Sequence, residues 1–218
     1  MEIIKLSEPK KENKITDIKA AVRNENRVNI FINGEFSFSL DISQLIDYKL
    51  KIGESLSEEK IAEIKRASTF GKVYARTLEW VLTRPRSTKE TQDYLKLKIY
   101  KNKIEDFTDE DINEIIKKLV NKKYLDDEKF AEYYVENKNI KKGISDKKLK
   151  YELRKKGIND EIIKRTLEKS ERNPEEEIKK IILKKGNKYS PEKLFNYIVR
   201  QGFSYELAKK EVEEFFKT

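Results

Sequence analysis

Three acidic residues stand together in the segment Tyr124–Tyr134, where carboxylate chemistry would have to be sought first. Asp126, Asp127 and Glu128 carry the oxygen ligands that Mg²⁺ and Ca²⁺ prefer. Acidic residues at a helix start, however, also satisfy free backbone amides and complement the helix dipole. Because the apolar residues that follow have the spacing of a buried helix face, we interpret the cluster as a helix start rather than a metal site.

The chain lacks the residue types on which many active sites depend. Its 218 residues include no cysteine and no histidine, which excludes thiol nucleophiles, cysteine-ligated zinc and the commonest general base. The glycine-rich phosphate motifs GxxxxGK[ST] and GxGxxG are also absent from the sequence. Carboxylate catalysis is compatible with the composition, but no carboxylate pair has a convincing base or nucleophile beside it. We predict no catalytic residue, no cofactor and no metal.

A basic segment is the best candidate for a binding surface. The formal net charge is +9, yet residues 1–70 are neutral, with 12 Lys/Arg and 12 Asp/Glu. Between Lys138 and Lys156 stand nine basic and two acidic residues. Such a surface suits an acidic partner, either a protein or nucleic acid, and the alternative is a solvated face without a ligand.

Helix electrostatics explains only part of this segment. Arg154, Lys155 and Lys156 end a predicted helix, where each cation is stabilised by about 0.3–1 kcal/mol. Lys147 and Lys148 fall in the first turn of the same helix, where positive charge opposes the dipole by a similar amount. We therefore predict partner contacts for this segment and for one counterpart in the third repeat described below. The candidate residues are Lys141, Lys142, Lys147, Lys148, Arg154, Lys155, Lys156 and Arg200.

A glycine turn recurs 45 residues apart, in LRKKGINDEII (153–163) and IVRQGFSYELA (198–208). We interpret Gly157 and Gly202 as helix C-caps in the left-handed conformation, which glycine adopts at low cost. A Schellman cap requires an apolar contact across the turn. The pairs Leu153/Ile158 and Ile198/Phe203 meet that requirement.

The recurrence extends well beyond the glycine. A shift of 45 residues places Ser145–Glu168 on Ser190–Glu213 without a gap and keeps the apolar positions. A third, more diverged copy begins at Ser87, with IYKNKIED in place of the glycine turn. Each copy is preceded by another helical segment: VYARTLEWVL, EKFAEYYVENK or PEEEIKKIILKK. The pattern predicts three tandem three-helix repeats.

The N-terminal part has a different pattern. In RVNIFINGEFSFSLD, two alternating apolar runs flank Asn33-Gly34, the preferred type I′ hairpin turn. ITDIKAAV adds an expected third strand, and ISQLIDYKL and SEEKIAEIKRAS are expected to cover the sheet as helices. We predict a mainly α protein, an elongated array of three-helix repeats after a small antiparallel β-hairpin or sheet with helices. The expected boundaries are 1–70, 71–124, 125–172 and 173–218.

Several motifs together resemble the RecX family, regulators of the RecA recombinase. These are KKYLDDEKFAEYYV, the loop KKGIS and LKYELRKKGINDEIIKRTL, with YKLKIGESLS similar to the longer members. The resemblance implies a fold of three tandem three-helix repeats and a non-catalytic protein that binds the RecA–DNA filament and limits its growth or activity. It also implies that some members bind single- or double-stranded DNA. A general basic DNA-binding protein acting without RecA is the alternative.

The location of the protein is predicted from what the sequence lacks. No stretch approaches 18 consecutive apolar residues, and MEIIKLSEPKKENK has no apolar core of a secretory signal. We expect a cytoplasmic monomer that does not contact a membrane.

Overall fold

The computed structural model describes residues 12–22, 24–104, 107–138 and 141–217. They form two compact units, which are described separately. The first contains the residues up to Thr77 and those from Ile104 to Asp111. The second contains Leu78–Lys103 and the residues from Ile112 onward.

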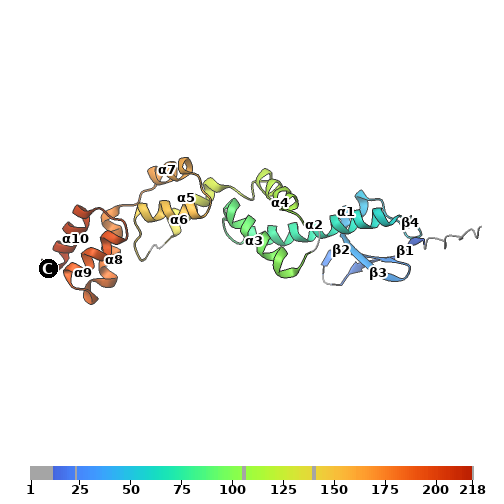
Figure 1. The fold of residues 1–218 in the computed structure, drawn as a ribbon, viewed down its shortest axis with the longest axis horizontal. Coiled ribbons are helices and arrows are strands. Elements are labelled where there is room, and N and C mark those ends of the chain that lie inside the picture. Colours follow the sequence, from blue (N-terminus) through green and yellow to red (C-terminus); the bar gives the residue numbers. More distant parts are fainter. Residues whose placement is uncertain (1–11, 23, 105–106, 139–140, 218) are drawn as a thin grey trace, which may run out of the picture. The chain divides into compact units, whose positions relative to one another are not determined.

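The first unit is built on a four-stranded antiparallel sheet, drawn in blue in Figure 1. Its strands are β1 (Asn13–Ala21), β2 (Asn24–Ile32), β3 (Glu35–Asp41) and β4 (Ser55–Leu56), in the order β3-β2-β1-β4. The predicted hairpin turn is confirmed, since Asn33 and Gly34 have φ angles of 52° and 84°. The expected third strand is β1. Residues 1–11, which the predicted sheet also included, lie outside the described residues.

Apolar side chains from one face of the sheet form the core of this unit. Ile30 of β2 and Leu40 of β3 are completely buried, as is Ile64 of α2 (Glu58–Leu82). The short helix α1 (Ile42–Asp47) follows β3 directly. Burial of each such side chain contributes about 1.5–3 kcal/mol. The alternation in the sequence therefore set which face of the sheet the helices cover.

The segments SEEKIAEIKRAS and VYARTLEWVL are not separate helices, because α2 runs without interruption from Glu58 to Leu82. The expected boundary at residue 70 lies inside this helix. Gly71 permits a close approach here: a Cβ on it would lie 3.1 Å from Nε2 of Gln44. The Gln44 amide donates a hydrogen bond to the carbonyl oxygen of Ala67 at 2.9 Å. These contacts offset the cost of about 0.5–1 kcal/mol that a glycine imposes on a helix.

Residues 107–111 join the first unit through contacts with α2. The guanidinium of Arg66 pairs with the Asp111 carboxylate at 3.2 Å, and the rings of Phe70 and Phe107 stack with centroids 6.2 Å apart. Burial alone would raise the pKa of Asp111, but the amide of Thr108 and the Arg66 guanidinium hold it below its usual value. Asp111 thus ties this connecting segment to the helix.

The second unit is helical over most of its described length (Figure 1). Three sets of helices follow one another: the end of α2 with α3 and α4, then α5, α6 and α7, then α8, α9 and α10. This agrees with the predicted mainly α, repeated fold. The bounds are α3 Thr88–Asn102, α4 Asp109–Asn121, α5 Asp127–Asn137, α6 Asp146–Lys155, α7 Asp160–Lys169, α8 Pro174–Lys185, α9 Pro191–Arg200 and α10 Tyr205–Lys217, with a 3₁₀ turn at Gly186–Lys188.

The second and third helix sets bury equivalent residues. Each set has its own apolar core. One core is formed by α5, α6, α7 and the segments between them, and the other by α8, α9 and α10. Positions 45 residues apart are buried in both cores, which confirms the repeat detected in the sequence. The equivalent pairs are Leu149/Leu194, Leu153/Ile198, Ile158/Phe203 and Ile163/Ala208.

The predicted glycine caps are also confirmed. Gly157 has φ 79° and Gly202 has φ 95°. The amide of Ile158 donates to the carbonyl oxygen of Leu153 at 3.1 Å, the long bond of a Schellman motif. In the first copy, which lacks this glycine, Lys103 takes the left-handed conformation at the end of α3, with φ 47°.

Candidate partner-binding surface

The basic segment forms α6 and the turn before it. Ser145 is the N-cap of α6, and its hydroxyl accepts a hydrogen bond from the amide of Lys148 at 3.2 Å. Leu149 and Leu153 are fully buried in the core of the second repeat. The basic residues of this segment lie outside that core, and the structure divides them into residues bonded within the chain and residues that are exposed.

Lys148 is bonded to the third repeat. Its ammonium group donates to Oε1 of Gln201 at 2.8 Å, while the hydroxyl of Ser145 donates to the Gln201 carbonyl oxygen at 2.5 Å. Both acceptors belong to the residue that ends α9. The unfavourable position of Lys148 in the first helical turn is thus explained by a contact within the chain.

The first and second repeats meet in the same way. The hydroxyl of Ser87, the N-cap of α3, donates to the carbonyl oxygen of Lys156 at 2.7 Å. The Glu90 carboxylate pairs with two basic groups, the Lys156 ammonium and the Arg84 guanidinium, each at 2.9 Å. We call the serine contact the repeat joint. In each joint, the N-cap serine of one repeat is hydrogen-bonded to the residue that precedes the glycine in the following repeat.

The glycines are part of the repeat joint as well as helix ends. A Cβ on Gly157 would lie 2.6 Å from Cβ of Lys89, and a Cβ on Gly202 would lie 2.9 Å from Oγ of Ser145. Neither position has room for a side chain without a shift of its neighbours. The repeated glycine therefore permits both a left-handed turn and the close approach of the preceding repeat.

Glu90 is the charged centre of the first joint. Burial raises the pKa of its carboxyl, but hydrogen bonds from Arg84 and Lys156 outweigh this effect and hold the pKa below the ordinary 4.5. Ser87 and Glu90 have the spacing of a capping box, in which the glutamate would bond back to the N-cap amide. Ser87 does cap α3, whereas the Glu90 side chain is turned to the two basic groups.

Two further candidates have partners on their own surface. The guanidinium of Arg154 contacts Asp160 at 2.6 Å, and both side chains are exposed. The ammonium group of Lys155 lies 4.8 Å from the centre of the Tyr151 ring. Exposed pairs of these kinds contribute about 0–1 kcal/mol, so a partner can displace them at little cost.

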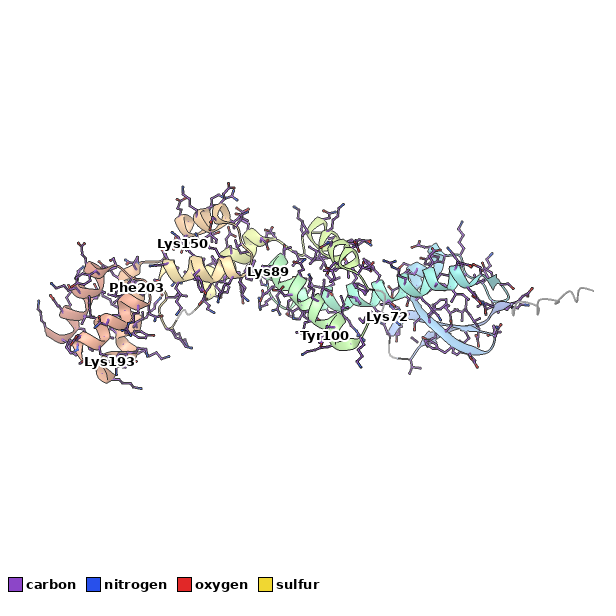
Figure 2. All side chains as sticks on the ribbon, viewed as in Figure 1. Lys72, Lys89, Tyr100, Lys150, Lys193 and Phe203 are labelled. Carbon is purple, nitrogen blue, oxygen red and sulfur yellow. The ribbon has the colours of Figure 1, made fainter. Side chains whose placement is uncertain are left out.

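The remaining candidates are exposed and have no ion-pair partner among the residues that the structure describes. Lys141 and Lys142 lie in the turn before α6, and Lys147 lies in its first turn. Lys150 of α6, labelled in Figure 2, is equally exposed. We call Lys141, Lys142, Lys147 and Lys150 the exposed lysine set. Arg200, at the end of α9, is exposed but belongs to the third repeat.

The acidic cluster at the start of α5 has protein partners. Asp126 caps α5 by accepting from the amides of Glu128 and Lys129, as the sequence predicts. Asp127 instead accepts from the amide of Thr88, at 2.7 Å, and so caps the neighbouring α3. Within the described ranges, no group of three acidic side chains is arranged to hold a metal ion.

Sequence reasoning missed Gln201, which accepts a hydrogen bond from Lys148, and Lys89, which lies against Gly157. Gln201 carries no charge, and Lys89 stands in an ordinary helical segment, so neither belongs to a recognisable motif. The signal that would have found them is the repeat itself. The N-cap serine and the glycine recur in successive repeats. Residues next to these two positions are therefore candidates for a surface that two repeats share.

Two stretches of the chain match models of known protein families. Residues 13–57 match the family model of the regulatory protein RecX N-terminal domain, and residues 126–167 match that of the second three-helix domain of RecX. The regulatory protein RecX of Bacillus licheniformis is 34% identical over 209 residues, covering 92% of this chain and 76% of the relative. The chain belongs to the RecX family. A further RecX family member, from Listeria monocytogenes, is 36% identical over 211 residues, covering 92% and 75%.

Solved structures of the RecX family have the same fold. A crystal structure of regulatory protein RecX aligns with a TM-score of 0.68 at 27% identity, covering 92% of this chain and 99% of that one. The RecX of Lactobacillus salivarius aligns with a TM-score of 0.52 at 25% identity, covering 70% and 99%. Among the described residues, no helix has the length and apolar character needed to cross a membrane.

Proposed function

We propose that this chain binds the RecA–DNA filament and mainly inhibits the recombinase, by occupying the filament rather than by catalysis. The observation that carries the proposal is membership of a family of RecX regulatory proteins, over 92% of the chain. We place this activity in the cytoplasm, in a monomer that serves DNA repair and the SOS response. The chain needs no cofactor for it.

The repeat joints support this proposal physically. Repeats bonded by Ser87 to Lys156 and by Ser145 to Gln201 are held in a definite arrangement. A series of linked repeats can contact successive subunits of a filament. Binding of this kind needs no pocket for a small substrate.

The exposed lysine set supports an acidic contact on the filament. Lys141, Lys142, Lys147 and Lys150 have no ion pairs to lose within the described chain. Their attraction can be directed to an acidic protein surface or to exposed phosphates. We propose them, with Arg154, Lys155 and Arg200, as the contact residues. Lys148 and Lys156 contribute indirectly, because their ammonium groups are bonded within the repeat joints.

The first experiment measures ATP hydrolysis by RecA on single-stranded DNA, with and without the chain. We expect hydrolysis to fall as the chain is added. Unchanged hydrolysis at several-fold molar excess would refute the proposal. Magnesium-dependent cleavage of the DNA in the same samples would instead indicate an enzyme.

The second experiment separates filament binding from general DNA binding. The exposed lysine set is changed to glutamate, and a control variant changes Lys49, Lys51, Lys65 and Lys117, which are exposed elsewhere. A general DNA-binding protein would lose both DNA affinity and RecA inhibition in the first variant only. Retained inhibition without DNA affinity would show that the protein contact suffices. The affinity of the wild type for bare DNA should decrease steeply with salt if phosphates are bound.

A further inference from the structure

The second repeat has a surface between α5 and α7 that another part of the chain covers. Six of the residues that line it belong to α5 and to the end of α7: Glu132, Val135, Glu136, Thr166, Lys169 and Ser170. Arg172, in the segment leading to the third repeat, lies against it and donates to the carbonyl oxygen of Val135 at 3.0 Å. Arg172 also pairs with the buried Glu177 at 2.6 Å. Within the chain, this surface therefore binds a segment that carries an arginine.

The third repeat presents the equivalent surface between α8 and α10, which pack together (Figure 1). The helices α7 and α10 correspond with a shift of 45 residues, and α5 and α8 with a shift of 47 from Asp127 to Pro174. These shifts place the six residues named above on six residues that line one groove in the third repeat. The six are Lys179, Ile182, Leu183, Glu211, Glu214 and Phe215, which we call the terminal groove.

No described residue from outside α8 and α10 lines the terminal groove, and its composition differs from that of the covered surface. Leu183 replaces Glu136 and is 83% exposed, an unusual state for a leucine beside two other apolar residues. Apolar side chains grouped at an exposed groove are typical of a surface that binds another protein.

Glu211 is the buried charged residue of the terminal groove. It replaces Thr166, and its side chain is only 2% exposed. Its Oε1 atom is buried and accepts no hydrogen bond from the described residues. The ammonium groups of Lys179 and Lys210 are 3.8 and 3.9 Å from its carboxylate, too far for hydrogen bonds. A buried carboxylate oxygen without a donor is costly, which favours an occupant that supplies one.

We propose that the terminal groove docks an arginine-bearing segment of the filament's protein subunits, with an apolar side chain on Leu183 and the guanidinium on Glu211. Arginine is favoured over lysine because its planar guanidinium is more weakly hydrated and binds a carboxylate through two hydrogen bonds. Arg172 on the second repeat is the precedent within the chain. The proposal rests on the proposed function, since it names a contact within the same complex.

The test uses the full chain and RecA filaments on single-stranded DNA, with affinity measured by biolayer interferometry. We expect Leu183→Glu to weaken binding by about tenfold or more, as for a central interface residue. Leu97→Glu is the matched control, because Leu97 is 50% exposed on α3, away from the groove. Equal affinities of wild type and Leu183→Glu would overturn the terminal-groove proposal alone. Absence of binding by the wild type would overturn the proposed function and, with it, this docking site.

The guanidinium contact is tested by a double-mutant cycle. Glu211→Gln removes the charge without removing volume, and we expect it to weaken filament binding about threefold to tenfold. Among alanine variants of exposed RecA arginines, one should weaken binding of the wild type but not of Glu211→Gln. Strict additivity for every arginine would overturn the contact. Sedimentation of the chain alone provides the last arm: self-association abolished by Leu183→Glu would make a second copy the occupant and overturn the proposal.

Discussion

Ser87 and Lys156 are 69 positions apart in the sequence, and the hydroxyl of the first donates a hydrogen bond to the carbonyl oxygen of the second at 2.7 Å. Ser145 and Gln201 repeat this relationship one repeat later, at 2.5 Å. The same serine oxygen also caps its own helix. One small side chain therefore ends a helix and joins two repeats.

Replacing a joint serine should cost more than replacing an ordinary cap. Ser145→Ala loses the helix cap, about 0.5–2 kcal/mol, and leaves the Gln201 carbonyl unpaired, about 1–3 kcal/mol. Ser190→Ala is the matched control, because Ser190 caps α9 but is exposed. We expect losses of about 2–4 kcal/mol and about 1 kcal/mol respectively, measured by urea denaturation. Equal losses would mean that the joint bond contributes nothing.

Alanine at the joint glycine should be more destabilising than alanine at a glycine with the same conformation in open space. Gly157→Ala must adopt φ near 79° and places a Cβ 2.6 Å from Cβ of Lys89. Gly34→Ala meets φ near 84° but no atom within 4 Å. The conformational strain is about 1–2 kcal/mol in both. We expect Gly157→Ala to lose about 1 kcal/mol more of the free energy of unfolding than Gly34→Ala, because of the close contact with Lys89. Hydrogen exchange of the nearest amides would measure the difference.

Acid should loosen the first repeat joint through Glu90. Its folded-state pKa is lowered from 4.5 by Arg84 and Lys156, despite burial. A lowered folded-state pKa means that the ionised carboxylate stabilises the folded chain fully above pH 4.5, and that this stability disappears as the pH falls through the lowered value. The thermal midpoint of the wild type should therefore fall more steeply below pH 4.5 than that of Glu90→Gln. Parallel pH profiles would contradict this role.

Breaking the buried pair between Arg172 and Glu177 should be severe. Their side chains are 12% and 5% exposed, and the charged atoms are 2.6 Å apart. Arg172→Met leaves the Glu177 charge buried, with Lys180 as its one remaining basic partner among the described residues. We expect a loss of about 3–5 kcal/mol in the free energy of unfolding. Arg154→Met is the control, because its pair with Asp160 is exposed and contributes about 0–1 kcal/mol. Similar losses of stability for the two variants in calorimetry would show that burial does not determine how much these ion pairs contribute to the free energy of unfolding.

Local patterns predicted most of the fold correctly. The turn conformations at Asn33-Gly34 and at the two repeated glycines depend on residues within a few positions, so a short segment is enough to predict them. The helix through Gly71 was missed for the opposite reason. Within this helix Gly71 lies against Gln44, which is 27 positions away, and a local pattern does not reveal such a contact.

The sequence by itself determined the repeat, the caps, the hairpin and the basic character of residues 138–156, because each depends on residue type and local spacing. Only the tertiary structure decided which lysines are free. Lys147 and Lys148 are adjacent and chemically identical, yet one is exposed and the other donates to Gln201, 53 positions away. The distinction arises because a helix directs neighbouring side chains about 100° apart. The Lys148 ammonium group reaches Gln201, whereas Lys147 lies with its aliphatic stem near Gly202 and leaves its ammonium group exposed.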